Sequence, residues 1–147
     1  MKEGRIKRNR WSIIFGLVVL IICLIFRITP SKINNYTDVV SAILSLSSMA
    51  TSFLFASFAL IPALPDSKLL KGLKELGTDK KLLDRLLITI IGFVFCSIFS
   101  LIALTISSRN DSLLANIILS VMSGFLAFSL LDLLKVLRIL LVGVEHI

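Results

Sequence analysis

The stretch LPDSKLLKGLKELGTDKKLLDRLL, residues 64–87, decides the fold of this chain. It is basic and half apolar, and it separates two uncharged runs, Val39–Pro65 and Leu86–Ser108. A helix needs about 20 residues to cross the hydrocarbon core of a bilayer, because it rises ~1.5 Å per residue. Both runs meet that length, so the sequence predicts one membrane crossing before this basic segment and another after it.

Two more uncharged runs lie farther out, Trp11–Phe26 and Ser112–Leu131. The first is short, and we expect it to gain Ile28 and Thr29 if the side chain of Arg27 reaches up to the headgroups. The whole chain, residues 1–147, is then a single membrane domain. We predict spans at about 11–29, 39–61, 86–107 and 112–134, with a loop at 62–85.

The composition agrees with this assignment. Hydrophobic residues make up 56% of the chain and charged residues 17%, and the mean hydropathy is +0.98. A soluble domain of this size needs more polar surface than that. The predicted fold class is an all-α integral membrane protein: an antiparallel four-helix transmembrane bundle with a short interfacial amphipathic helix between the second and third spans.

A removable signal peptide is the alternative explanation for the first run, which follows a basic start. No cleavage site with small residues follows it, and Ile22 precedes Cys23, where lipoprotein processing requires a small residue. We therefore predict a retained helix.

The basic residues are distributed unequally between the two sides of the predicted membrane. Thirteen Lys and Arg fall in the N-terminal segment, the central loop and the C-terminal tail, against three in the other two loops. Cytoplasmic segments carry such an excess. We predict a multi-pass protein of a bacterial plasma membrane with both termini and the central loop in the cytoplasm. This bias also explains the net charge of +7, which otherwise is typical of nucleic-acid-binding proteins.

The central loop predicts a short amphipathic helix. Asp66 can cap its start, leucines recur on one face and lysines occupy the other. We expect this helix to lie in the interface, with its lysines toward anionic lipid headgroups. A docking face for a cytosolic partner is the alternative; nucleic acid is not expected, because no aromatic residue interleaves with the lysines. The candidate contact residues are Lys68, Leu69, Lys71, Leu73, Lys74 and Leu76.

Small and polar residues at helical spacing predict where the spans pack, because membrane helices associate through close backbone approach and polar contacts. The alternative is that the serines line a water-filled pore. Serine hydroxyls can bond to their own helix, which favours packing. The predicted seams are Ser41, Ser45, Ser48 and Ser52 on the second span, Gly92, Cys96 and Ser100 on the third, and Asn116, Ser120 and Ser123 on the fourth.

Charged residues at the predicted span ends suggest ion pairs at the headgroup level. Asp84 and Arg85 open the third span, and Asp132 and Lys135 lie one turn apart near the end of the fourth. We expect Asp84 and Arg85 to pair with each other or, alternatively, with Asp132 and Lys135 across the bundle.

Catalytic and metal-binding patterns are missing from the sequence. The single histidine, His146, is the penultimate residue, and the two cysteines lie within apolar runs. No phosphate-binding glycine-rich loop or metal-ligand spacing occurs. We expect neither an enzyme nor a bound cofactor.

Three functions fit such a chain. The first is a non-catalytic membrane protein that acts through helix packing and partner contacts, such as a phage-defence component or a toxin-immunity protein. The second is an oligomeric pore or permeability effector, and the third is an accessory subunit of a larger membrane complex. Partners are then membrane lipids, further copies of the chain, or a cytosolic or membrane protein.

The layout and the local sequence ALPDSKLLKGLKELG, residues 63–77, give one resemblance. The chain resembles the membrane component of the lambda Rex phage-exclusion system, a family with about this length, four spans and a basic loop after the second span. The resemblance implies a membrane-depolarising channel in phage defence, whereas the spans of this chain lack strongly polar runs.

Overall fold

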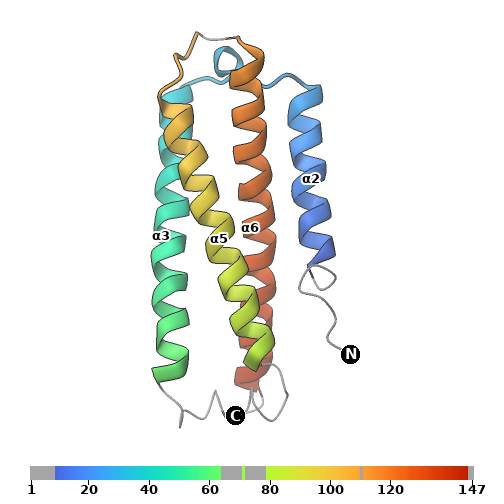
Figure 1. The fold of residues 1–147 in the computed structure, drawn as a ribbon, viewed down its shortest axis with the longest axis vertical. Coiled ribbons are helices and arrows are strands. Elements are labelled where there is room, and N and C mark those ends of the chain that lie inside the picture. Colours follow the sequence, from blue (N-terminus) through green and yellow to red (C-terminus); the bar gives the residue numbers. More distant parts are fainter. Residues whose placement is uncertain (1–8, 64–70, 72–78, 110, 146–147) are drawn as a thin grey trace.

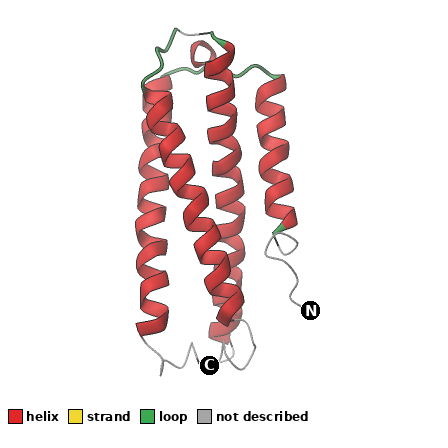
Figure 2. Cartoon of the chain, viewed as in Figure 1, coloured by secondary structure: helices red, strands yellow, loops and turns green. Residues whose placement is uncertain are grey.

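The computed structural model describes residues 9–63, 71, 79–109 and 111–145. These residues form helices and loops without strands (Figure 2). Three of the helices contain stretches long and apolar enough to cross a membrane, Tyr36–Leu60, Lys81–Leu104 and Leu113–Val142. The first helix is apolar but shorter. The elements are α2 (Arg10–Ile25), the short 3-10 helix η1 (Pro30–Lys32), α3 (Tyr36–Ala63), α5 (Asp79–Leu104) and α6 (Leu113–Glu145).

The helices run alternately up and down (Figure 1). α6 packs against α5 and α2, and α5 packs against α3, so α2 lies at the edge of a group formed by the other three helices. α2 begins, α3 ends, α5 begins and α6 ends at one end of the molecule (Figure 1). We call this end the basic end, because the predicted cytoplasmic segments adjoin it. The other end carries the connections after α2 and after α5, and we call it the loop end.

The first helix is shorter than the sequence predicts. It ends at Ile25, and the expected extension to Thr29 is wrong. Arg27 adopts the left-handed conformation, with φ +46°, and its N–H donates to Leu24 O while the N–H of Ile28 donates to Cys23 O. These two bonds form a Schellman motif, which satisfies the last carbonyl groups of a helix and ends it.

The later helices extend beyond the uncharged runs. α5 begins at Asp79, and α6 continues through Asp132, Lys135 and Arg138 to Glu145. Lys and Arg have good helix propensity, and leucines continue between the charged residues, so nothing in these turns breaks the helix. The uncharged runs therefore predicted where the helices are apolar and underestimated how long they are.

The core lies between α3, α5 and α6. Near the loop end, Tyr36 and Val40 of α3 pack with Ala103 of α5 and Leu119 of α6. Nearer the basic end, the buried residues of a second cluster are Leu54, Leu82, Leu86, Phe93 and Val136. The space between these three helices is filled by side chains over most of their length.

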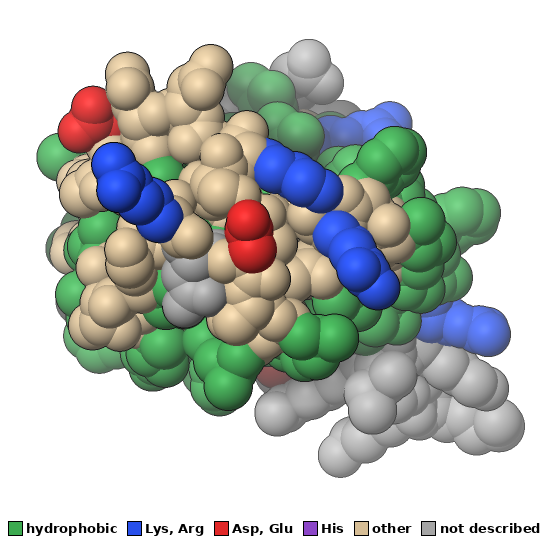
Figure 3. Space-filling model, turned by 90° about the horizontal axis from the view of Figure 1, so that it is seen from above, with side chains coloured by type: hydrophobic (Ala, Val, Ile, Leu, Met, Phe, Trp, Pro, Cys, Tyr) green, Lys and Arg blue, Asp and Glu red, His purple; other side chains and the backbone are tan. Residues whose placement is uncertain are grey.

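The loop end has a polar surface. Seen along the bundle, polar groups and a few charged side chains occupy the middle of this face, and hydrophobic side chains surround them (Figure 3). Arg27, Lys32, Asp38, Arg109 and Asp111 are exposed here. A polar end above an apolar circumference is the distribution expected of a bundle that leaves the membrane at this level.

Candidate functional site

A carboxylate is buried between three helices near the basic end. Asp132 of α6 has no exposed surface. Asn9 Nδ2 and Thr89 Oγ1 donate to its Oδ2 atom at 3.1 and 3.3 Å, and Ser12 Oγ donates to its Oδ1 atom at 3.1 Å. Side chains from α5 and α6, from α2 and from the residue just before α2 thus meet at one carboxylate. We call Asn9, Ser12, Thr89 and Asp132 the aspartate cluster.

Two basic side chains adjoin the aspartate cluster. Lys135 Nζ donates to Ser12 Oγ, and that hydroxyl in turn donates to Asp132. Arg85, on α5, is close enough to Lys135 for their positive charges to interact. The predicted residues Arg85, Asp132 and Lys135 therefore do come together. Ser12 bridges Asp132 and Lys135, which the structure does not join as a direct ion pair, and Asp84 is half-buried next to Arg85.

The aspartate cluster lies close to one boundary of the apolar part of the bundle. At ~1.5 Å per residue, α6 rises about 28 Å from Leu113 to Asp132, close to the ~30 Å thickness of a hydrocarbon core. Trp11, next to Ser12, is 80% exposed. Tryptophan is enriched at the membrane–water boundary. The carboxylate is enclosed by helices and lies about one hydrocarbon-core thickness from the loop end of α6.

Two atoms near this carboxylate have no hydrogen-bond partner among the described residues. They are Asn9 Oδ1 and Ser129 Oγ, and Ser129 precedes Asp132 by one helical turn. Thr89 Oγ1 has only one proton, and it lies 2.8 Å from Arg85 O as well as 3.3 Å from Asp132. Asn9 Oδ1 thus lacks a donor and Thr89 shares one proton between two acceptors, so the cluster is short of donors, which favours a nearby cation such as Lys135.

The chemistry available here is electrostatic. The buried carboxylate accepts hydrogen bonds from Asn9 and Ser12 and shares the Thr89 proton with Arg85 O, so it ties these side chains together. Each charge-assisted bond is worth about 1.5–3 kcal/mol. The described residues contain no group of three or more His, Cys, Asp or Glu that could hold a metal ion. The arrangement suits a role in joining α2 to α5 and α6.

A second polar contact joins the two connections at the loop end. Ser31 Oγ donates to Asp111 Oδ1, and Thr29 Oγ1 lies 3.1 Å from Ser31 Oγ. The hydrogen bond from Ser31, followed by that from Thr29 and by the charge of Lys32, lowers the pKa of Asp111 below its ordinary value. Lys32 Nζ also donates to Arg27 O at 2.9 Å. This contact fixes the α2–α3 connection against the start of α6.

The seam predicted on the second span does not pack within the chain. Ser45, Ser48 and Ser52 are exposed and Ser41 is half-buried, whereas Ser47 is fully buried. The small residues do recur along one face of α3, but α5 contacts a different face of this helix. The buried line of α3 consists of Tyr36, Val40, Ser47 and Leu54.

The seams predicted on the third and fourth spans do lie inside. Gly92, Cys96 and Ser100 are buried on α5. On α6, Asn116 and Ser120 are buried and Ser123 is half-buried. A Cβ atom at Gly92 would lie 2.3 Å from Ser129 Oγ, so α5 and α6 approach closely at this glycine.

Most hydroxyl groups in these helices bond to their own helix. Ser47, Ser52, Ser97, Ser120 and Ser123 each donate to the carbonyl four residues earlier, at 2.7–3.0 Å. A hydroxyl satisfied in this way needs no water.

The interfacial helix expected in the central loop lies almost entirely outside the described residues. Lys71 is exposed, and Lys68, Leu69, Leu73, Lys74 and Leu76 lie outside the described residues. Asn9 and Thr89 are partners of Asp132 that the sequence pattern did not predict. One signal could have found Thr89: it follows Arg85 by four residues, which places both on one face of α5.

Comparison with known proteins adds no relative to this description: no family model, no curated protein and no solved structure matches the chain. The resemblance to the membrane component of the Rex system thus stays a prediction.

Proposed function

We propose that the chain crosses the bacterial plasma membrane four times and acts, without catalysis, by binding another membrane helix along the outer face of α3.

The surface of α2 supports the fourth crossing. The helix has 16 residues, about 24 Å at ~1.5 Å per residue, and carries no charge after Arg10. Its outward residues are apolar, among them Ile14, Leu17 and Ile21, each about half exposed. A helix without a polar face has no side suited to water. The positive-inside bias then puts the basic end in the cytoplasm.

This topology can be tested with single cysteines in intact cells. A membrane-impermeant maleimide is expected to label Asn34→Cys and Ser108→Cys at the loop end, and to label Lys71→Cys only after the cells are opened. Labelling of Lys71→Cys in intact cells would show that the orientation is the reverse of the proposed one. Protection of Asn34→Cys would show that α2 does not cross the membrane.

The outer face of α3 carries the proposed function. At about 100° per residue, Ser48 and Ser52 lie roughly 100–140° around the helix from the buried Ser47. Ala56 and Ala59 continue this line toward the basic end, and both are exposed. Small residues let the backbones of two membrane helices approach closely. We call Ser45, Ser48, Ser52, Ala56 and Ala59 the α3 stripe.

The exposed side chains on the other side of α3 are bulky, unlike the small residues of the α3 stripe. Leu46 and Phe53 are exposed on the other side of the same helix, and Phe53 is 71% exposed. Bulky side chains of this kind suit contact with lipid, whereas the α3 stripe leaves a shallow, narrow surface. Ser52 Oγ donates to Ser48 O at 3.0 Å, so this hydroxyl of the stripe needs no water.

The filled core favours contact over a channel within one chain. Phe93, Val40 and Leu119 have almost no exposed surface and occupy the space between α3, α5 and α6. A pore would have to form between copies of the chain, and that arrangement is one outcome of the experiment below.

Cysteine cross-linking in native membranes tests the contact. Ser48→Cys and Ser52→Cys are expected to give a cross-linked species of higher mass, and the matched variants Leu46→Cys and Phe53→Cys on the other side of α3 are not. Cys23 and Cys96 are buried, so the parent chain supplies the background. Equal cross-linking on both sides, or none, would remove the α3 stripe as an interface.

The mass of the cross-linked species separates the remaining functions. A product of twice the chain mass indicates a second copy, and depolarisation of the same membranes would then favour the pore. A product with a different protein identifies the partner, and a toxin or a defence protein there would fit the immunity or phage-defence role.

A further inference from the structure

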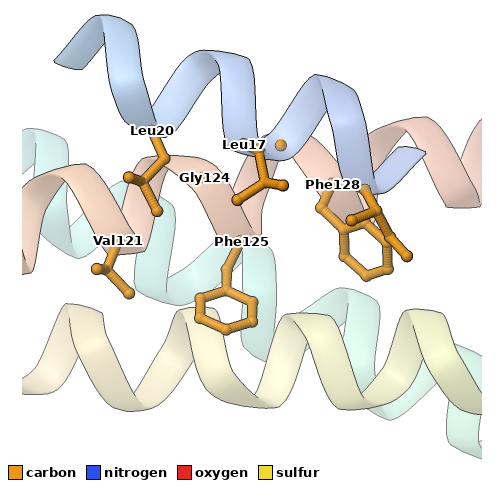
Figure 4. A pocket seen from close by; sticks show the side chains of 8 residues that line it. Leu17, Leu20, Val121, Gly124, Phe125 and Phe128 are labelled. Atoms are coloured by element: carbon orange, nitrogen blue, oxygen red, sulfur yellow. The ribbon is translucent and has the colours of Figure 1, made fainter. Parts of the chain in front are cut away.

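An apolar groove runs along α6 between α2 and α5 (Figure 4). Its volume is about 210 Å³. Ile13, Leu17 and Leu20 of α2 and Val121, Phe125 and Phe128 of α6 form its walls, and Phe125 points toward α5 (Figure 4). The lining is almost entirely carbon.

The groove is held open by fixed contacts. Phe125 stacks on Phe95 and Phe99 of α5, with ring centroids 5.4 and 5.9 Å apart. On the opposite side, Gly16 brings α2 against Gly124 and Phe128 of α6. The width of the groove is therefore set by packing at both edges.

An unfilled groove of this size is unfavourable in a membrane, because its walls lose dispersion contacts. A cavity of about 150 Å³ lined by Leu, Ile and Phe holds a benzene-sized molecule. The groove therefore has room for roughly six or more carbon atoms, and its length follows the helix axis, which suits the extended shape of a lipid acyl chain.

The charges beyond the groove indicate which lipid. Lys135 continues the face of α6 that carries Val121 and Phe128, because the three residues recur at seven-residue spacing. Arg10 precedes Ile13 by one turn on α2. At ~1.5 Å per residue, Lys135 lies about 10 Å beyond Phe128 toward the basic end. Each of these two helices thus carries a cation just beyond the end of the groove that faces the basic end of the molecule.

Arg85 adds a third cation from α5, close enough to Lys135 for their charges to interact. Two acidic groups lie near these three cations, so the formal charges leave an excess of one positive charge. Asp132 is fully buried and its oxygens accept bonds from the aspartate cluster, and Asp84 is half-buried beside Arg85. Cations grouped in this way at headgroup level attract anionic lipids.

From the continuity of groove and cations we propose that this surface binds one anionic phospholipid, with an acyl chain between α2 and α5 and the phosphate beside Arg10, Arg85 and Lys135. The site lies on the opposite side of α5 from α3 and does not depend on the α3 stripe.

Native mass spectrometry of the full chain in detergent tests the site. The protein is incubated with equal amounts of phosphatidylglycerol and phosphatidylethanolamine that have identical acyl chains. We expect one lipid to stay bound, with phosphatidylglycerol preferred at least several-fold.

Two pairs of variants distinguish the contribution of the acyl chain to binding from the contribution of the headgroup. Val121→Phe fills the groove and is expected to lower lipid retention about tenfold, whereas Val18→Phe makes the same change on the exposed side of α2 and leaves retention unchanged. Lys135→Gln keeps a donor for Ser12 and is expected to abolish the preference for phosphatidylglycerol. Arg138→Gln, exposed one turn farther on, is expected to retain it.

Circular dichroism and gel filtration of each variant establish that it is folded. Should Val121→Phe misfold, Leu17→Phe fills the groove from α2 and replaces it. Equal retention by the groove variant and Val18→Phe overturns the site, and so does the absence of any bound lipid. A dimer that Val121→Phe dissociates would show that a second copy fills the groove instead.

Discussion

Gly16 on α2 and Gly124 on α6 face each other across the contact between these helices. A Cβ atom on Gly16 would lie 3.0 Å from Gly124 O, and a Cβ atom on Gly124 would lie 3.1 Å from Gly16 O. Each glycine therefore leaves the space that the backbone of the other helix occupies. This contact attaches α2 to the rest of the molecule, together with the aspartate cluster, which lies about one turn from Gly16 along α2 and about two turns from Gly124 along α6.

Replacing Gly16 by Val is expected to loosen α2. The new side chain meets backbone and the Cβ atom of Phe128, which cannot move aside easily. Overpacking of this kind costs about 1–3 kcal/mol. Unfolding in detergent micelles, followed through the fluorescence of the single tryptophan, Trp11 on α2, measures the loss. Val18→Leu, exposed on the same helix, is the control, and equal midpoints for the two variants would contradict the close contact.

Removing the buried carboxylate is expected to destabilise the fold. Asp132→Leu deprives Asn9, Ser12 and Thr89 of their acceptor and leaves Lys135 without a nearby anion. The loss of charge-assisted bonds at a buried site predicts about 2–4 kcal/mol. Thr89→Val, which removes one donor, should cost less than half of this.

The same unfolding measurement checks both substitutions in the aspartate cluster. Arg138→Gln is the control, since Arg138 is exposed on the same helix. If Asp132→Leu were as stable as the parent chain, the cluster would contribute nothing to the attachment of α2.

Ser129 and Gly92 are expected to be coupled. Ser129→Ala removes a buried hydroxyl that has no hydrogen-bond partner in the described part of the chain, so it should be neutral or should stabilise by up to about 1 kcal/mol. Gly92→Ala alone should destabilise by about 1–3 kcal/mol, because its Cβ atom would lie 2.3 Å from Ser129 Oγ.

In the double variant part of the Gly92→Ala loss should return, because the oxygen is gone while the Phe128 ring still lies 3.2 Å from the new Cβ atom. A double-mutant cycle measures this coupling. Strict additivity of the two substitutions would show that the helices separate there instead of clashing.

Acid is expected to weaken the contact at the loop end. The hydrogen bonds from Ser31 and Thr29 hold the pKa of Asp111 below its ordinary value of 3.8. A lowered pKa in the folded state means that the carboxylate stabilises the fold fully above about pH 3.8, and that this contribution disappears as the pH falls through the lower, folded-state value.

The thermal midpoints of the parent chain and of Asp111→Asn, compared across this range, check the sign. The parent should be slightly more stable near pH 6, and the difference should vanish near pH 2. The difference is expected to be small, since Asp111 is exposed. A difference that grows in acid would contradict the direction of the pKa shift.

The sequence by itself determined the helical class and the order of the apolar segments. Three of the uncharged runs are long enough to cross a bilayer, and in lipid such runs can bury their backbone polar groups only as helices, so composition and length sufficed for them. The ends of the segments were predicted less well. The first helix does not extend to Thr29, because Arg27 adopts a left-handed conformation that a pattern of apolar residues does not reveal.

Only the tertiary structure decided which faces meet. In water, the apolar face of a helix identifies its buried side, but in lipid both sides are apolar and the pattern loses that information. The sequence therefore pointed to Ser48 on α3, whereas α5 contacts Ser47. The same reason hid the aspartate cluster, since Asn9 and Asp132 are 123 positions apart and become neighbours only when α2 crosses α6 at two glycines.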